Sequence, residues 1–333
     1  MLNACLELDP AVLSPSPLLK PIRNGYGEGL VALGELNPQV VVLTADMSDS
    51  TCCTEFARRF PARFFNCGVA EENMAAVAAG LGLTGKIVYI SSYAAFSPGK
   101  NWETVRTTIV YNNSRVKIAG HHSGIITGPD GVTHQATEDI ASTRCWPNIR
   151  VIVPCDAIEA RKATIWAAQI PTAVYLRFTA AQTPIMTTEA TPFDGRVHVY
   201  WECARPQAVI FATGHLLYFT LLAASELEQE GLEVLVANVA VIKPLDESGT
   251  ARLAARAGAV VTVEDHQVTG GLGGALAEFF ARTTPMPMEF VGLQDTFAES
   301  GAPADLIVKY GLDTEAIKAA VRRVIDRKRR LHL

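Results

Sequence analysis

The sequence has few features that would tie the chain to a nucleic acid or a membrane. Its 29 Lys and Arg are outnumbered by 34 Asp and Glu, giving a formal net charge of -5. This balance argues against a nucleic-acid partner or an anionic membrane surface. The longest low-charge run, MAAVAAGLGLTG, is too short and too rich in glycine to cross a bilayer.

Several catalytic and metal-binding motifs are also missing. The 7 cysteines form no CxxC pair and show no ligand-like spacing with histidine, so no metal site is predicted. Their odd number, without a signal segment at the start, predicts reduced thiols and a cytoplasmic location. Walker A, G-x-S-x-G and H-E-x-x-H motifs are absent. The stretch VEDHQVTGGLGGAL begins the dinucleotide pattern G-x-G-x-x-G at Gly271 but does not complete it. Leu276 stands where the pattern requires its last glycine.

What the sequence does contain is an alternation of short apolar runs with helical periods. This alternation predicts an α/β fold with two doubly wound domains, each built on a mostly parallel sheet. A break rich in Pro, Thr and Gly separates the two halves. We therefore predict an irregular leader at 1–20, a first domain at 21–180, a linker at 181–206 and a second domain at 207–333.

Two adjacent glutamates, Glu71 and Glu72, open an apolar helix in the stretch GVAEENMAAVAAGLGL. An acidic residue in a first helical turn is often only a partner of the helix dipole. This helix, however, is apolar on most faces, so at least one of the two carboxyl groups is expected to point inward. A carboxyl group withdrawn from water keeps its proton more readily and can act as a proton donor.

Two further stretches follow predicted strands. SSYAAF places Tyr93 and Phe96 three residues apart, either as core aromatics or as a surface on which a flat heteroaromatic ring could stack. AGHHSGIITGPDGVTHQATED contains three histidines, His121, His122 and His134, in a loop with Gly-Pro-Asp-Gly turn chemistry. Three histidines in one such loop indicate a functional site.

Taken together, these motifs resemble the transketolase family. GVAEENMAAVAAGL, SSYAAF and the histidine loop are similar to the pyrimidine-binding domain, and VEDHQVTGGLGGALAE is similar to the C-terminal domain. The family's N-terminal domain, with its GDG…N ligands for thiamine diphosphate and magnesium, has no counterpart here. The chain therefore resembles the C-terminal half of a split transketolase.

The resemblance implies a partner and an assembly. A separate N-terminal subunit would bind the diphosphate and hold the Mg²⁺ or Ca²⁺ ion. Two copies of each subunit would form an α2β2 assembly, with the small-residue helix from Met74 to Gly82 packed at an interface. The activity it implies is transfer of a two-carbon ketol unit from a ketose to an aldose.

The resemblance also implies roles for residues around the cofactor. Glu71 matches the family's glutamate that hydrogen-bonds a ring nitrogen of the cofactor's aminopyrimidine, and Glu72 would be structural. Tyr93 and Phe96 would stack on that ring. Asp46 would lie near the thiazolium ring from the opposite side.

For the substrate, His122 and His134 would contact oxygens and assist proton transfer, while Asp130 would bind a hydroxyl group. Arg23 and Ser50 match positions that hold a terminal phosphate.

The phosphate pocket departs from the family pattern. Arg177 in YLRF would also contact the substrate, but the arginine expected three residues later is Ala180. One bidentate phosphate contact would therefore be missing, and the sequence leaves the substrate's phosphorylation open.

Three other functions are consistent with parts of this pattern. The beta subunit of a 2-oxo acid dehydrogenase has a similar size, but THQATED and AEENM are closer to transketolase. A synthase of the 1-deoxyxylulose phosphate type normally carries all three domains on one chain. A catalytically idle assembly subunit would have no physical reason to keep Glu71, the aromatic pair and both histidines together.

Overall fold

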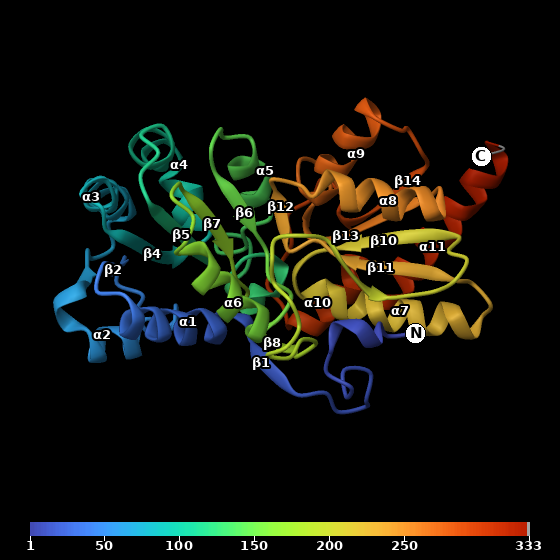
Figure 1. Cartoon of the computed structure of the whole chain (residues 1–333), viewed down its shortest axis with the longest axis horizontal. Coiled ribbons are helices and arrows are strands. Elements are labelled where there is room, and N and C mark those ends of the chain that lie inside the picture. The colour runs from blue at the N-terminus through green and yellow to red at the C-terminus, as the bar shows by residue number, and fades with distance from the viewer. Residues whose placement is uncertain (332–333) are drawn as a thin grey trace.

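The computed structural model describes residues 1–331. They form two α/β units side by side along the long axis of the molecule (Figure 1). The last two residues of the predicted second domain lie outside the described part. Both units contain parallel strands with helices on either side, which confirms the predicted fold class.

The first unit is a seven-stranded sheet in the order β12-β6-β7-β5-β4-β2-β3. All pairs are parallel except β12 with β6. All residues of β2, which lies between β4 and β3, are buried, as expected for a sheet covered on both faces. The strands span Val40–Thr44 (β2), Phe64–Asn66 (β3), Ile87–Tyr93 (β4), Val116–His121 (β5), Arg150–Ile152 (β6), Val174–Arg177 (β7) and Val241–Lys243 (β12).

Alternate residues of these strands supply two separate cores. Val40 and Val42 of β2 belong to the core with α1 and α6, whereas Val41 and Leu43 belong to the core with α3 and α5. The helices of this unit are α1 (Ile22–Leu36), α2 (Thr54–Arg59), α3 (Glu71–Leu83), α4 (Trp102–Thr104), α5 (Asp139–Arg144) and α6 (Ala157–Ala167).

The second unit has five strands in the order β14-β13-β10-β11-β9. Helices α7 and α11 share one core with its sheet, and α8 and α9 share the other. The elements are β9 (His198–Trp201), β10 (Ala208–Ala212), α7 (Leu217–Gln229), β11 (Val234–Asn238), α8 (Glu247–Ala257), β13 (Val260–Gln267), α9 (Leu272–Arg282), β14 (Met288–Leu293), α10 (Pro303–Lys309) and α11 (Thr314–Arg330).

The segments predicted as an irregular leader and linker contain short strands in the structure. The predicted leader is packed against the chain: Leu2 bridges to Trp201, Leu6 and Val12 are buried, and β1 (Leu19–Pro21) pairs with β8. The predicted linker contains β8 (Gln182–Pro184) and also β9, which pairs with β11. Composition alone predicted irregular segments because these strands are short and interrupted by Pro, Thr and Gly.

Strand β12 crosses from the second half of the chain into the first sheet. Sequence periodicity predicts a single strand from 232 to 241, but the chain leaves the second sheet after Asn238. Val241 then pairs with Ile152, and Lys243 pairs with Val151. The chain therefore passes from the first sheet to the second and returns to the first sheet at β12.

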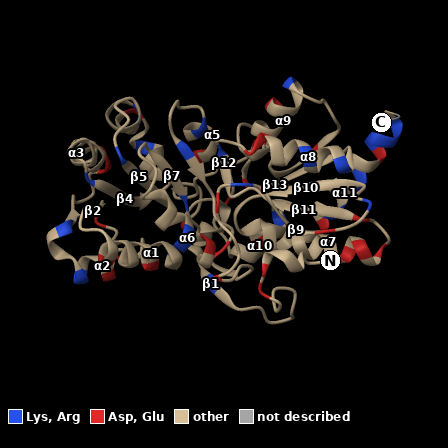
Figure 2. Cartoon of the chain, in the orientation of Figure 1, with Lys and Arg blue, Asp and Glu red and all other residues tan. Residues whose placement is uncertain are grey.

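The basic residues at the C-terminus lie along the end of α11 (Figure 2). Several are paired with nearby acids, including Arg322 with Glu230 and Arg323 with Glu289. This agrees with a solvent-exposed helix end, where basic side chains interact favourably with the helix dipole. None of the helices in residues 1–331 is long and apolar enough to cross a membrane.

Helix α1 packs closely on α6 because glycines face the contact. A Cβ atom at Gly25 would lie 1.8 Å from the carbonyl oxygen of Ala157, closer than any real contact. The exposed Gly80 of α3 differs, since a Cβ atom there would meet no atom within 4 Å.

We predict that Gly25→Ala destabilises the chain by about 1–3 kcal/mol, because two backbones must separate to admit the methyl group. The matched change Gly80→Ala should instead stabilise it by roughly 0.5–1 kcal/mol through a lower entropy cost. Urea unfolding of both variants measures the two effects. Equal and small effects would contradict the close packing of α1 on α6.

Candidate functional site

The predicted site residues gather where parallel strands end. Asp46 follows β2, Tyr93 ends β4, His122 follows β5 and Arg177 ends β7. These four strands are neighbours in the order β7-β5-β4-β2, so their carboxyl ends form one edge. Open α/β sheets bind ligands at this edge.

Glu71 is the buried member of the glutamate pair. It is the first residue of α3 and is only 2 % exposed, whereas the side chain of Glu72 is 48 % exposed. This confirms the expectation that one carboxyl group points inward. Its Oε2 lies 3.3 Å from Nζ of Lys100, and its carbonyl oxygen accepts a hydrogen bond from Asn101 Nδ2 at 2.9 Å.

Four rings lie together in the segments that follow β4 and β5. The planes of Tyr93 and Phe96 are nearly parallel, at 10°, with centroids 6.0 Å apart. His122 stacks on Tyr93 at 3.8 Å, and His134 meets the edge of Phe96 at 5.3 Å. The structure therefore brings the predicted aromatic pair and both predicted histidines into one cluster.

His122 is held in a strained conformation, with φ of 54°. Such backbone strain in a residue other than glycine is common at functional sites. Its Nε2 lies 3.3 Å from Arg23 Nη1, and its buried Nδ1 has no hydrogen-bond partner. Burial, with the neighbouring charge of Arg23, lowers the pKa of His122 to about 3, so the ring is neutral at physiological pH.

The third histidine of the loop is not part of this cluster. His121 is completely buried, and its ring packs 4.9 Å from Tyr26 and 5.2 Å from Phe178. Both of its ring nitrogens lack a partner, and burial lowers its pKa well below the usual value. His121 is therefore a neutral core residue.

Arg23 and Ser50 contact each other directly. Nη1 of Arg23 donates to the carbonyl oxygen of Ser50 at 2.8 Å, while its Nε is buried without a partner. The Ser50 hydroxyl donates to the carbonyl of Met47 at 3.3 Å. The pair is thus part of the site, but one arm of the guanidinium is already engaged.

Two acidic residues lie at the rim. Asp46 is exposed, has φ of 62°, and exchanges hydrogen bonds of 3.0 and 2.7 Å with the side chain of Asn66 at the end of β3. Asp130 is exposed at the end of the 3-10 helix Ile125–Asp130. Both carboxylates are open to solvent on the ligand side of the sheet.

Arg177 differs from the other predicted residues because its side chain is buried in an ion pair, and its contact with substrate stays a prediction. Its side chain is 3 % exposed, and its Nε lies 2.8 Å from Oδ2 of Asp139. Its Nη2 donates to the carbonyl oxygens of Ala136 and Asp265. Two of the three guanidinium nitrogens, Nε and Nη2, are thus engaged by groups of both units.

Sequence reasoning missed the residues that support the site. Lys100 and Asn101 lie in SPGKNW, only a few residues beyond the recognised Phe96, and contact Glu71. Asp265 is in the VEDHQ stretch, and its Oδ1 accepts a hydrogen bond from Ile125 N of the histidine loop at 3.0 Å. That contact joins residues 140 positions apart, so no local pattern predicts it.

The glycine-rich turn after β13 also has a structural explanation. The carboxylate of Glu264 accepts hydrogen bonds from Leu272 N and Gly273 N at 2.7 and 2.8 Å. It therefore occupies the amides at the start of α9, where a dinucleotide phosphate would bind. A Cβ atom at Gly271 would lie 2.0 Å from this carboxylate, which accounts for glycine there.

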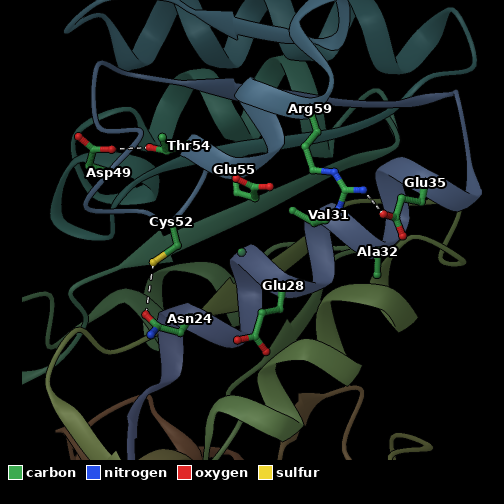
Figure 3. Close-up of a pocket in the computed structure, with 11 residues that line it drawn as sticks. Asn24, Glu28, Val31, Ala32, Glu35, Asp49, Cys52, Thr54, Glu55 and Arg59 are labelled. Atoms are coloured by element: carbon green, nitrogen blue, oxygen red, sulfur yellow. Dashed lines mark hydrogen bonds and ion pairs between the residues drawn. The ribbon is translucent and has the colours of Figure 1, made fainter.

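A separate cavity of about 580 Å³ lies between α1 and α2 (Figure 3). Carboxylates of Glu28, Glu35, Asp49 and Glu55 line it, and Arg59 is paired with Glu35. None of the predicted site residues lines this cavity. Within residues 1–331, no group of three or more His, Cys, Asp or Glu is arranged to hold a metal ion.

Comparison with known proteins places this geometry in a family. Residues 20–185 match the transketolase pyrimidine-binding domain, and residues 198–317 match the transketolase C-terminal domain. The chain belongs to the transketolase family. The buried Glu71, the aromatic pair and the histidine loop all fall within the pyrimidine-binding part.

Relatives within the transketolase family include chains of similar length. A protein of Methanocaldococcus jannaschii described as a transketolase C-terminal section is 40 % identical, over 91 % of this chain and 95 % of that protein. A 6-deoxy-6-sulfo-D-fructose transketolase subunit of a Clostridium species is 34 % identical, over 92 % and 95 %.

Among solved structures, a split gene transketolase, described as an inactive beta4 tetramer, has a TM-score of 0.86 at 41 % identity. The alignment covers 92 % of this chain and 98 % of that one. This chain is therefore a C-terminal type of transketolase subunit.

We predict that Arg177→Met lowers the free energy of unfolding by about 3–5 kcal/mol, because it leaves the Asp139 carboxylate buried and unpaired. Arg256→Met is the control, since Arg256 and its partner Glu202 are 36 % and 40 % exposed; it should cost less than about 1 kcal/mol. Denaturant unfolding at neutral pH compares the two variants. A similar loss of unfolding free energy in both would contradict a larger contribution from the buried Arg177–Asp139 pair.

The pH dependence gives a second measurement. Burial alone would raise the pKa of Asp139, but the charges of Arg177 and His266 and the hydrogen bonds from Arg177 and Tyr175 together lower that pKa below the ordinary 3.8. The stabilisation is therefore fully present above pH 3.8 and is lost as the pH falls through the lowered pKa. The difference between wild type and Arg177→Met should shrink in that acidic window.

Proposed function

We propose that this chain is the C-terminal subunit of a split transketolase that uses thiamine diphosphate and is active only with an N-terminal, diphosphate-binding subunit. Two observations carry the proposal: the buried carboxyl group of Glu71, which contacts Lys100 in the segment that follows Phe96, and the nearly parallel rings of Tyr93 and Phe96. In the reaction, the C2–C3 bond of a ketose breaks and its O3 loses a proton. The two-carbon unit bonds to an aldehyde carbon, whose oxygen gains a proton.

The described residues fit the aminopyrimidine half of the cofactor. Glu71 Oε2 is held by an ion pair only to Lys100, whose side chain is 54 % exposed and can move aside. Tyr93 and Phe96 add a flat apolar surface in the segment that leads to Lys100. A diphosphate and its Mg²⁺ or Ca²⁺ ion would require ligands on the partner subunit.

When bound, thiamine diphosphate supplies the chemistry that breaks and forms the carbon–carbon bond. Glu71 would donate a hydrogen bond from its carboxyl group to a ring nitrogen, because burial and the fixed start of α3 hold it in place. Tyr93 and Phe96 would orient the aminopyrimidine ring, and Asp46 would lie near the thiazolium ring from the opposite side.

The remaining residues of the site would bind and orient the substrate. His122 is neutral, so its free Nδ1 can accept a proton or a hydrogen bond from a substrate hydroxyl. His134 would assist at a second oxygen, and Asp130 would accept a hydrogen bond from a hydroxyl group. Arg23 and Ser50 would contact the end of the substrate away from the reacting carbons.

The assembly we propose contains two copies of this chain and two of the partner. Exposed apolar side chains lie on α3 and just before it: Val77 is 42 %, Leu83 62 % and Val69 72 % exposed. Exposed apolar side chains on one element are candidates for an interaction surface. The free thiols of the described cysteines agree with a reducing, cytoplasmic location.

A first test is purification of the tagged chain from its native host, with a thiamine diphosphate assay and analysis of co-purifying proteins. We expect about one cofactor per chain and a stoichiometric partner of the diphosphate-binding type. Cofactor and partner together with oxidative decarboxylation of a 2-oxo acid would favour a dehydrogenase beta subunit. A partner without turnover would favour an idle assembly subunit.

We predict that Glu71→Ala lowers the turnover of the purified complex by at least about 10²-fold, because the positioned proton donor is lost. Glu72→Ala is the control, since its side chain is half exposed and adjacent in sequence; it should change turnover less than about twofold. Unchanged turnover in Glu71→Ala would rule out the proposed role.

We also predict that Val77→Glu on α3 abolishes co-purification of the partner, because a charge would enter an apolar interface. Val308→Glu on α10, where Val308 is 63 % exposed, should leave the complex intact. Pull-down from the native host compares the two variants, and equal recovery of the partner would place the interface elsewhere.

A further inference from the structure

We infer that a second cavity, between the two units and next to β8, α7 and α10, is a binding site for a small uncharged molecule with an apolar body and one hydrogen-bond donor. The cavity has a volume of about 490 Å³. Small-molecule sites typically have volumes of about 300–1,000 Å³. None of the proposed transketolase site residues is among the residues that line it, so the inference does not depend on the proposed activity.

The walls of this cavity carry no charged side chain. The first unit contributes Ile126 of the histidine loop and residues in and near β1 and β8, and the second contributes residues in and near α7 and α10. Proline, alanine, isoleucine and leucine predominate, and Phe219 adds an aromatic ring. Asp, Glu, Lys and Arg are absent from the described residues that line the cavity. An ion there would lose its hydration without gaining a partner, so an uncharged ligand is favoured.

Three of the four polar residues in the walls can be satisfied without a ligand. Gln182 is exposed and Tyr218 is half-buried, so water can reach both side chains. The Thr183 hydroxyl donates a hydrogen bond to the carbonyl oxygen of Lys20 at 3.2 Å. His215, in the 3-10 helix Gly214–Leu216 directly before α7, differs because its side chain is only 4 % exposed.

The imidazole of His215 is neutral and has a buried nitrogen without a partner. Its Nε2 forms no hydrogen bond within residues 1–331 and lies 3.7 Å from Oδ2 of Asp265, which also lacks a partner there. Burial, with the charge of Arg177, lowers the pKa of His215 to about 3, so the ring is neutral at physiological pH. A neutral imidazole has one N–H donor and one acceptor nitrogen. A proton on Nε2 would face the Asp265 carboxyl oxygen and leave Nδ1 to accept a hydrogen bond from the ligand.

The cavity also shares a wall with the loop that carries the site histidines. Ile126 lines the cavity, and the amide of the preceding Ile125 donates to Oδ1 of Asp265 at 3.0 Å. The other carboxyl oxygen of Asp265 is the one beside His215. A bound molecule would therefore contact the loop directly through Ile126 and would contact the anchor of the loop through His215.

The test titrates indole and indene calorimetrically into the chain purified from its native host, together with any partner that accompanies it. Indole has an apolar bicyclic body and one N–H donor, and indene has nearly the same shape without the donor. We expect indole to bind at least about fivefold more tightly, the value of one neutral hydrogen bond. Equal affinities, or no binding of either compound at millimolar concentration, would overturn the inference.

Two alanine variants test the location of the bound indole. Ala304 is an exposed residue of α10 that lines the cavity, so Ala304→Phe should narrow the cavity and weaken indole binding by about tenfold or more. Ala255→Phe is the control, because Ala255 is an exposed alanine of α8 that does not line the cavity; it should leave the affinity unchanged. Equal affinities of the two variants would place the bound indole elsewhere and contradict the inference.

His215→Phe removes the acceptor nitrogen and keeps an aromatic ring. In a variant that retains the wild-type melting temperature, the preference for indole over indene should disappear while indene still binds. A preference that persists would show that His215 is not the acceptor. If His215→Phe does not fold, the comparison of indole with indene and the two alanine variants still decide the outcome.

Hydrogen exchange measures the contact with the loop and does not depend on turnover. Indole should slow amide exchange in the segment 122–130 of the wild-type chain and should not do so in Ala304→Phe. Exchange that indole leaves unchanged in the wild-type chain would contradict a ligand held against Ile126. Binding of indole to the separated chain but not to its complex would mean that a protein segment covers the cavity, which would also overturn the inference.

Discussion

The buried guanidinium of Arg177 is the contact on which the relation between the two units depends. It is bound to Asp139 at the start of α5 and to the carbonyl oxygen of Asp265 in β13. The Asp265 carboxylate in turn accepts a hydrogen bond from the amide of Ile125, in the loop that carries the histidines. A charge inside the protein must be fully paired, so these groups can adopt few alternative arrangements. The second unit therefore helps to hold the site formed by the first.

The site itself follows from the parallel sheet. Parallel strands bring residues far apart in the sequence to one edge, and the turns after β2 and β5 place Asp46 and His122 in left-handed conformations. Such conformations cost about 1–3 kcal/mol each and persist only where the surrounding structure fixes them. The hydrogen bonds of Asp46 with Asn66 and the stacking of His122 on Tyr93 provide this support.

The fold class and the buried Glu71 could be predicted because each depends on local pattern, whereas the resemblance to transketolases implied that Tyr93, Phe96, His122 and His134 share one site. A 3.6-residue period or an acidic first turn is visible within a dozen residues. The burial of Arg177 could not, because it depends on Asp139 and on Asp265, which is 88 positions away. The pairing of β12 with the first sheet was missed for a related reason. A short apolar run does not specify which of two sheets it joins.

Strand β12 has a consequence for how this gene can change by recombination. Residues 1–206 and 207–333 resemble two separable modules in sequence, but β12 from the second completes the sheet of the first. A crossover in the intervening segment would leave the β6 edge open and free to pair with another chain. The two parts must therefore be inherited together, and a foreign second half would be compatible only if it supplied an equivalent strand.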